Sequence, residues 1–295
     1  MKEFKTYHPI VNFIYFFAVI GFSMACMNPV YLLVSIVCSF VYACMQKGTK
    51  AVKTNLIFIL PMMLTTALLN PAFNHQGTVI LWYLPGGNPL TLESIVYGFA
   101  AAVMLAAVIN WFSCYNEIMT SDKFIYLFGR IIPSMSLILS MTLRFVPEFS
   151  NQLRCTANAQ KCIGRDISQG SIIKRAKSGL SVLSAMITWA LERSIETADS
   201  MKSRGYGLSA RTAFSIFKFD RRDLKTLVCI VVLSAVVLAG RITGYADFTY
   251  FPSMEWGEIN LYSILSVVSY LMLCLVPIVI ELWEERKWKY IKSKI

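Results

Sequence analysis

Residues 259–282 read INLYSILSVVSYLMLCLVPIVIEL, a long and predominantly apolar stretch in which Glu281 is the only charged side chain. A transmembrane α-helix needs about 20 consecutive apolar residues, because each residue adds about 1.5 Å and the hydrocarbon core of a bilayer is about 30 Å thick. This stretch meets that requirement. It predicts a membrane-spanning helix and thereby the class of the whole protein.

The composition of the chain agrees with a membrane protein. Of its 295 residues, 56% are hydrophobic and 15% are charged, whereas a soluble domain has about 45–50% and about 25%. The formal net charge of +11 would ordinarily indicate nucleic acid or an anionic surface as a partner. In such an apolar chain, nucleic acid is the weaker interpretation. We therefore predict a lipid bilayer as a partner, no nucleic acid, and a positive charge held outside the membrane.

Further apolar runs divide the chain into about six predicted transmembrane helices. Besides the run quoted above, they cover residues 10–27, 30–46, 56–69, 91–112 and 227–239. The apolar run 131–146 stays unassigned, because Pro133 and Arg144 interrupt it and Pro147 follows directly.

The lysines and arginines orient these helices. Loops 70–90 and 243–258 contain none of them, whereas residues 114–226 contain seventeen of the 28. Cytoplasmic loops carry the excess of Lys and Arg. The counts therefore predict a multi-pass protein of the cell (plasma) membrane with both termini in the cytoplasm.

The same division predicts three regions. N-terminal transmembrane helices occupy residues 1–113, a cytoplasmic domain occupies 114–226, and C-terminal transmembrane helices with a basic tail occupy 227–295. The middle region is too long for a structureless connection. Its apolar residues recur every three or four positions over 149–163 and 172–201, which is typical of amphipathic helices. The predicted fold is all-α, a polytopic membrane protein with a cytoplasmic domain of long amphipathic helices.

The longer amphipathic helix carries a wide apolar stripe. We expect this stripe to pack both against the neighbouring helix and against a second membrane protein. Its members are Leu180, Leu183, Ala185, Ile187, Ala190, Leu191, Ile195 and Ala198.

Each amphipathic helix ends in a short basic turn that contains glycine, at residues 159–166 and 198–207. Asp166 is a predicted cap in the first turn. Basic residues at a helix C-terminus are favoured by the helix dipole even without a partner, so a purely structural role stays open. The functional alternative is that an arginine at a rigid helix tip enters a groove on another subunit. Its planar fork would there pair with carboxylates or carbonyls.

Several short motifs along the chain resemble the T component of energy-coupling factor transporters, the ABC-type importers of vitamins and metal ions. The similarity covers nearly the whole chain, in order. The motifs are Tyr7-His8-Pro9, Thr91-Leu92-Glu93-Ser94, Phe145-Val146-Pro147, Ala159-Gln160, Ser203-Arg204-Gly205-Tyr206-Gly207, Arg211-Thr212 and Phe219-Asp220-Arg221-Arg222-Asp223-Leu224.

The resemblance implies a coupling and scaffold subunit. Such a chain holds a membrane-embedded, substrate-binding S component through its cytoplasmic coupling domain, and two ABC-type ATPase subunits dock beneath it. The resemblance implies no catalytic residue, no bound metal and no cofactor in this chain, which is not an enzyme; ATP is used by the partner subunits. Two motifs centred on arginine, at the tips of coupling helices, each enter a groove on one ATPase. The second motif corresponds to Ser203, Arg204 and Gly205.

The first motif departs from the family pattern. The family tends to read Ala-Gln-Arg-x-Arg-Gly, whereas residues 159–164 read AQKCIG and place Ile163 where the coupling arginine is expected. Either Arg165 or Lys161 supplies the charge, or this tip docks mainly by apolar contact. The candidate ATPase-coupling residues of this tip are Gln160, Lys161, Gly164 and Arg165.

Two other classes of function compete with this interpretation. A stand-alone secondary transporter or channel would need ionisable groups near mid-membrane and usually repeated halves, and the predicted spans contain almost no such groups. A membrane enzyme would need clustered His, Asp or Glu, and the chain has two histidines. Its eight cysteines form no CxxC pair, which argues against a cysteine-built zinc site. The coupling-subunit interpretation is therefore favoured.

Overall fold

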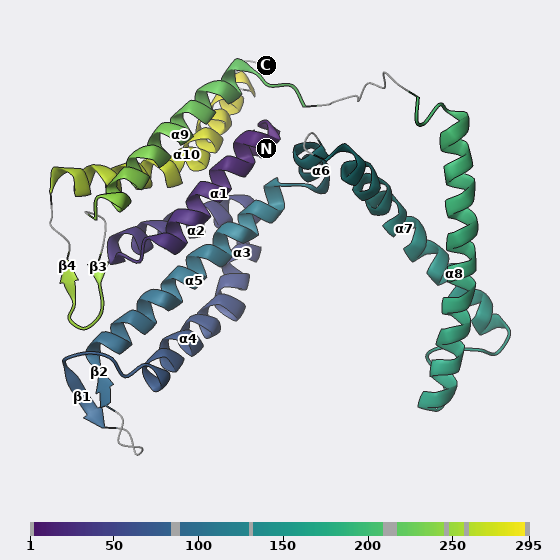
Figure 1. Cartoon of the computed structure of the whole chain (residues 1–295), viewed down its shortest axis with the longest axis horizontal. Coiled ribbons are helices and arrows are strands. Elements are labelled where there is room, and N and C mark those ends of the chain that lie inside the picture. Colours follow the sequence, from purple (N-terminus) through teal and green to yellow (C-terminus); the bar gives the residue numbers. More distant parts are fainter. Residues whose placement is uncertain are drawn as a thin grey trace. The chain divides into compact units, whose positions relative to one another are not determined.

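The computed structural model describes residues 3–83, 89–129, 132–208, 217–244, 248–256 and 260–292. The chain forms two compact units (Figure 1). The first combines Met1–Phe124 with Phe217–Ile295, and the second is Ile125–Ile216. The second unit lies inside the region predicted as the cytoplasmic domain. The motif at residues 211–212 lies outside the described residues.

The first unit is built from apolar helices. After a 3₁₀ turn at Glu3–Thr6 come α1 (Pro9–Ala25), α2 (Pro29–Lys47), α3 (Thr49–Thr54), a π-helical turn (Asn55–Ile59), α4 (Leu60–Phe73), α5 (Leu92–Ile118), α9 (Arg221–Ile242) and α10 (Leu261–Lys292). Helix α6 (Ser121–Gly129) begins in this unit. Two antiparallel strand pairs complete it: β1 (Ile80–Tyr83) with β2 (Pro89–Thr91), and β3 (Phe248–Thr249) with β4 (Glu255–Trp256).

Five helical segments in the described part of the chain are long and apolar enough to cross a membrane: α2, the continuous helix Thr49–Phe73, α5, α9 and α10. Helix α1 is also apolar but has 17 residues, at the short end of the range for a span, which is about 17–25 residues. The predicted all-α, polytopic membrane fold is confirmed. The unassigned run 131–146 continues into a polar helix, α7 (Pro133–Cys162), which is not among these candidate spans.

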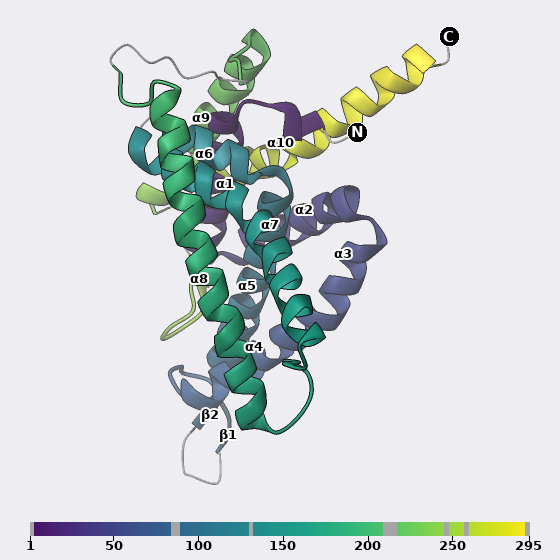
Figure 2. The same ribbon diagram turned by 90° about the vertical axis from the view of Figure 1, so that its right-hand side faces the viewer.

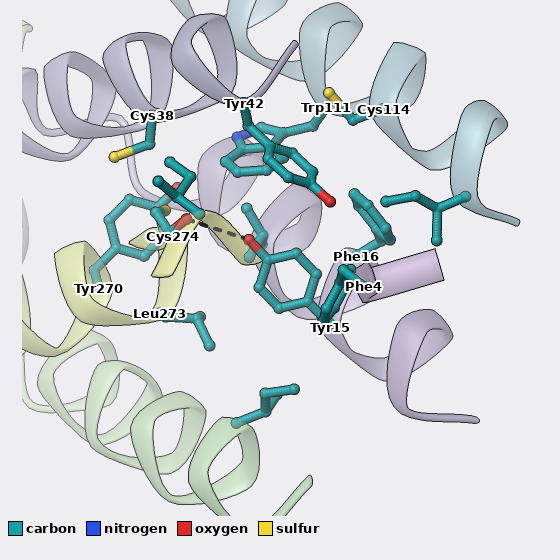
Figure 3. Packing of buried hydrophobic residues seen from close by; sticks show 14 of the residues in the cluster. Phe4, Tyr15, Phe16, Cys38, Tyr42, Trp111, Cys114, Tyr270, Leu273 and Cys274 are labelled. Carbon is teal, nitrogen blue, oxygen red and sulfur yellow. Dashed lines mark hydrogen bonds between the residues drawn. The ribbon is translucent and has the colours of Figure 1, made fainter. Parts of the chain in front are cut away.

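The core of the first unit is aromatic (Figure 3). Trp111 of α5 is fully buried against Tyr15 and Phe16 of α1 and Tyr42 of α2, with ring centroids 6.2–6.4 Å apart. Lipid tails are as apolar as leucine, so close packing, rather than escape from water, holds such helices together. Large flat rings supply that contact area among these three helices.

Hydrogen bonds between side chains tie the same helices at fixed points. Trp111 Nε1 donates to Ser35 Oγ (3.1 Å), and the Tyr31 and Ser266 hydroxyls lie 2.6 Å apart. Polar contacts between helices persist in a bilayer because no water competes for them. A Cβ added at Gly240 of α9 would collide with Ser266 of α10, so the lack of a side chain lets these two helices approach closely.

The two strand pairs lie at one end of the first unit's helices, and the N-terminal turn and the end of α10 lie at the other (Figure 1). His8 closes the latter end. Its ring packs edge-on against Phe219 at 5.1 Å, and its Nδ1 accepts a hydrogen bond from the Ile10 backbone N–H at 3.3 Å. Only a neutral imidazole can accept at this nitrogen.

The stability of this end should depend on pH through His8. Burial lowers the pKa of its imidazole below the ordinary 6.5, the Lys123 charge lowers it too, and Asp223 opposes them. Between the lowered pKa and 6.5, the unfolded chain therefore binds more protons than the folded chain. The contribution of neutral His8 to the free energy of unfolding is complete above pH 6.5, and it is lost as the pH falls through the lowered pKa of the folded state. We expect the melting temperature to fall between about pH 7.5 and about pH 5.5. His8→Asn should reduce this pH dependence and His75→Asn should preserve it; equal curves for wild type and His8→Asn would contradict the prediction.

The second unit is a pair of long helices, α7 and α8 (Ile172–Ser203), which pack side by side (Figure 2). Phe149 contacts Trp189 with ring centroids 5.1 Å apart, and Thr156 Oγ1 lies 3.8 Å from Met186 Sδ. From the first contact to the second, the residue number rises on α7 (149 to 156) and falls on α8 (189 to 186), so the two helices are antiparallel. Their ends are therefore two separate helix tips.

The predicted packing of the apolar stripe was wrong in one respect. Helix α8 buries Ser178, Val182 and Met186, whereas the large members of the predicted stripe are exposed. The reason is that 178, 182 and 186 form their own i, i+4 row on another side of the helix. The exposed members are Leu180, Leu183, Ile187, Leu191 and Ile195, at 53–66% exposure.

Candidate functional site

The tip of α7 ends in a glycine-stabilised C-cap. Ile163 is the cap residue, and Gly164 follows with φ +79°. The backbone N–H of Gly164 donates to Lys161 O (3.0 Å), and that of Arg165 donates to Gln160 O (3.0 Å). These two bonds define a Schellman motif, which satisfies the last free carbonyls of the helix.

The tip of α8 ends in the same way. Arg204 is the cap residue, and Gly205 follows with φ +82°. The backbone N–H of Gly205 donates to Lys202 O, and that of Tyr206 donates to Met201 O, both at 3.0 Å. Residues 163 and 204 therefore hold equivalent positions on two equivalent helix ends. The structure brings the predicted site residues to these tips.

The two equivalent tips differ in chemistry. The cap residue is the exposed Ile163 on α7, at 69% exposure, and the exposed Arg204 on α8. The next residue but one is Arg165 on the first tip and Tyr206 on the second, both exposed. The order is thus apolar then basic on one tip, and basic then aromatic on the other.

The first tip uses one of its charges internally. Lys161 Nζ lies 3.4 Å from Asp166 Oδ2. The Ser168 backbone and hydroxyl groups donate to Asp166 at 2.8 and 2.7 Å; these bonds, with Lys161, hold the pKa of the carboxyl below its usual range. Asp166 therefore orders the turn, while the residue at the N-cap of α8 is Ser171. Lys161 is the less available of the two candidate charges.

The remaining predicted residues support the tips. The Gln160 carbonyl accepts the Schellman hydrogen bond, and its half-buried side chain points inward. The Ser203 hydroxyl donates to Ser200 O at 2.9 Å, one turn back along α8. The Gln160 backbone carbonyl and the Ser203 hydroxyl thus stabilise the last turns, and the exposed cap residues are left as groups available to a partner.

Each tip is a capped helical end with an exposed cap residue, Ile163 or Arg204, and a second exposed side chain two residues later. No three His, Cys, Asp or Glu side chains gather at a possible metal site within the described ranges. The exposed cap residues Ile163 and Arg204 are therefore the candidate contact residues of these tips.

Comparison with known proteins identifies the family. The family described as "Cobalt transport protein" (CbiQ) matches residues 5–214, which include both tips. The chain is a T component of the energy-coupling factor transporters.

Individual relatives agree. This T component is 31% identical over 187 residues to the energy-coupling factor transporter transmembrane protein EcfT of Streptococcus thermophilus, covering 60% of this chain and 70% of that protein. It is 26% identical over 192 residues to the protein of the same name from Lactobacillus helveticus, covering 62% and 69%. The family resemblance inferred from the short motifs is confirmed.

Proposed function

We propose that this T component couples ATP hydrolysis by two ABC-type ATPase subunits to a membrane-embedded S component that binds a vitamin or a metal ion. The chain acts as a scaffold in the plasma membrane and transmits the conformational change of the ATPases to the S component. It binds no cofactor of its own. The observation that carries this proposal is Arg204, an exposed arginine at the capped end of a 32-residue helix.

Arg204 is suited to docking in a groove. Its guanidinium is always charged and presents donors in a fixed fork, which can pair with carboxylates or with carbonyls at a helix end. The Schellman motif fixes the backbone from which it projects, so little conformational entropy is lost on docking. This tip enters one ATPase through a charge-assisted contact.

The first tip docks differently. Its cap position presents Ile163, and Lys161 is paired with Asp166, so an apolar contact takes the place of the charged one. Arg165, two residues further, supplies a positive charge at the rim. The groove that accepts this tip therefore has an apolar floor, whereas the groove for Arg204 has acceptor oxygens.

The long helices α7 and α8 act as levers that carry motion away from the tips. A helix of 32 residues is about 48 Å long at about 1.5 Å per residue. The exposed stripe along α8 offers the S component an apolar surface, since exposed apolar patches of this kind mark interaction sites. ATP binding closes the ATPases, moves the tips, and the helices carry that motion to the S component.

The orientation follows from charge. Loops 70–90 and 243–258, which contain the strand pairs apart from Thr91 at the end of β2, have no Lys or Arg. Since Lys and Arg concentrate on the cytoplasmic side, the strand pairs face outward, and the N-terminal turn and the end of α10 face the cytoplasm. The chain leaves the first unit after Phe124 and returns to it at Phe217.

Reconstitution tests the function against the alternative of a stand-alone transporter or channel. We expect liposomes with the purified chain alone to accumulate neither radiolabelled vitamins nor radioactive cobalt. Liposomes with the chain, its ATPases and its S component should accumulate one of these probes when ATP is supplied. ATP-independent accumulation by the chain alone would overturn the proposal.

A further inference from the structure

A segment of residues 3–8, here called the N-terminal brace, is held by α6. Lys123 is buried, with 4% exposure, and its Nζ donates to Lys5 O (2.6 Å) and Tyr7 O (3.4 Å). Asn12 completes this shell: in the amide orientation that satisfies both of its ends, its oxygen accepts from Lys123 Nζ at 2.7 Å. One amine thus binds three oxygens from the brace and the first turn of α1.

The brace is also held by α9. The backbone N–H of His8 donates to Asp223 Oδ1 at 3.4 Å, and Asp223 is 2% exposed. The Arg222 guanidinium lies 4.2 Å from the centre of the Tyr7 ring and 3.4 Å from Thr6 Oγ1. Asp223 also accepts from the Asp220 backbone N–H at 3.2 Å, which orders the start of α9.

The anchors Lys123, Arg222 and Asp223 lie close to the two points where the chain passes between the units. The chain leaves the first unit after Phe124 and returns to it at Phe217. Lys123 stands immediately before the departure, and Arg222 and Asp223 stand just after the return. Both connections to the second unit therefore begin from helix ends fastened to the same short segment.

We propose that the N-terminal brace, through Lys123, Arg222 and Asp223, holds together the starts of α6 and α9, the two helix ends through which the first unit connects to the second, and that coupling requires this hold. These are positioning residues, which act through the brace and contact neither ATP nor substrate. The proposal rests on the proposed function: motion that starts at the helix tips reaches the S component only if the starts of α6 and α9 are held. Without the brace, the ATPases still dock at the tips, but their motion displaces the starts of α6 and α9 and does not reach the S component.

Buried charged groups hold the brace in place. Burial lowers the pKa of Lys123 to about 8, Lys5 lowers it too and Asp223 opposes them, so the amine is mostly protonated at neutral pH. Removing one partner of a buried charged group leaves the other without compensation, which is costly. The brace therefore has one favoured position, in which both helix ends are held together.

The test uses the full chain, alone in nanodiscs and in the complex with its ATPases and S component. Arg222→Ala removes the contact with Tyr7 from an exposed position and leaves the buried groups in place, and Arg221→Ala on the neighbouring exposed residue is its control. Lys123→Met removes the buried amine, and Lys225→Met replaces an exposed lysine as its control. Hydrogen exchange of residues 3–12 is measured in nanodiscs, and uptake per ATP hydrolysed is measured in the complex.

We expect exchange of residues 3–12 to accelerate about tenfold in Lys123→Met and by less in Arg222→Ala. Uptake per ATP should fall at least fivefold, on the order of 1 kcal/mol of coupling, with ATPase binding retained and the controls like wild type. Unchanged exchange would overturn the brace. Faster exchange with unchanged uptake per ATP would overturn its positioning role. A wild-type chain that recovers no ATPases would instead contradict the proposed function, and the exchange data would still decide whether the brace exists.

Discussion

Arg204→Ala is expected to abolish ATP-dependent uptake and to weaken the hold on one ATPase subunit by more than about 30-fold, equivalent to about 2 kcal/mol. Arginines at the centre of an interface carry a large share of its binding energy, because a fork of donors is desolvated and paired at once. Arg204 is exposed at a capped helix end, so its removal leaves the fold intact. The measurement is the amount of each ATPase that co-purifies with the tagged chain, together with uptake by the reconstituted complex.

Two controls accompany this substitution. Arg154→Ala removes an exposed arginine from α7, away from its tip, and should behave as wild type. Ile163→Ala changes the equivalent cap residue and should have a smaller effect than Arg204→Ala, because it removes an apolar contact and no charge. Wild-type uptake by Arg204→Ala would refute the assignment of this tip.

Trp111→Ala is expected to destabilise the membrane-spanning unit by about 3–5 kcal/mol, the usual cost of removing a large buried aromatic side chain. Trp111 is fully buried among aromatic rings of α1 and α2, and its N–H is bonded to Ser35. The substitution removes that hydrogen bond and leaves a cavity between helices. Thermal unfolding of the purified chain in detergent, monitored by size-exclusion chromatography, measures the loss of stability.

The neighbouring residue is the matched control. Phe112 is 47% exposed on the same helix, so Phe112→Ala should lower the melting temperature by much less than Trp111→Ala. Equal melting temperatures for the two variants would show that the aromatic core does not determine the stability of this unit.

The sequence was informative where a single physical rule governs. Bilayer thickness sets the length of an apolar run, so the spans, including 259–282, could be predicted with no knowledge of packing. The glycines also had a local signal: Gly164, Gly170, Gly205 and Gly207 all have positive φ, as expected for residues that end helices and form turns.

The packing of α8 was less predictable. The stripe through Leu180 and the row of Ser178, Val182 and Met186 both repeat every three or four residues, so periodicity alone does not say which one meets α7. The facing side chains Phe149, Thr156 and Trp189 decide it, and their pairing depends on the turn that joins the helices. The exposed stripe then becomes a candidate partner surface.

The anchors of the N-terminal brace had no local signal. Lys123 stands among polar residues at a helix start, where a solvated lysine is the usual interpretation. Its burial arises because Lys5, Tyr7 and Asn12, more than a hundred residues earlier, place oxygens around it. Contacts across such a separation depend on how the helices assemble.

The most direct test of the central claim is native mass spectrometry of the complex purified through a tag on this chain. The account predicts a mass that contains this chain, two ATPase subunits and one S component, and loss of an ATPase from the complex in Arg204→Ala. A wild-type chain that purifies without ATPases under conditions that preserve membrane complexes would contradict it.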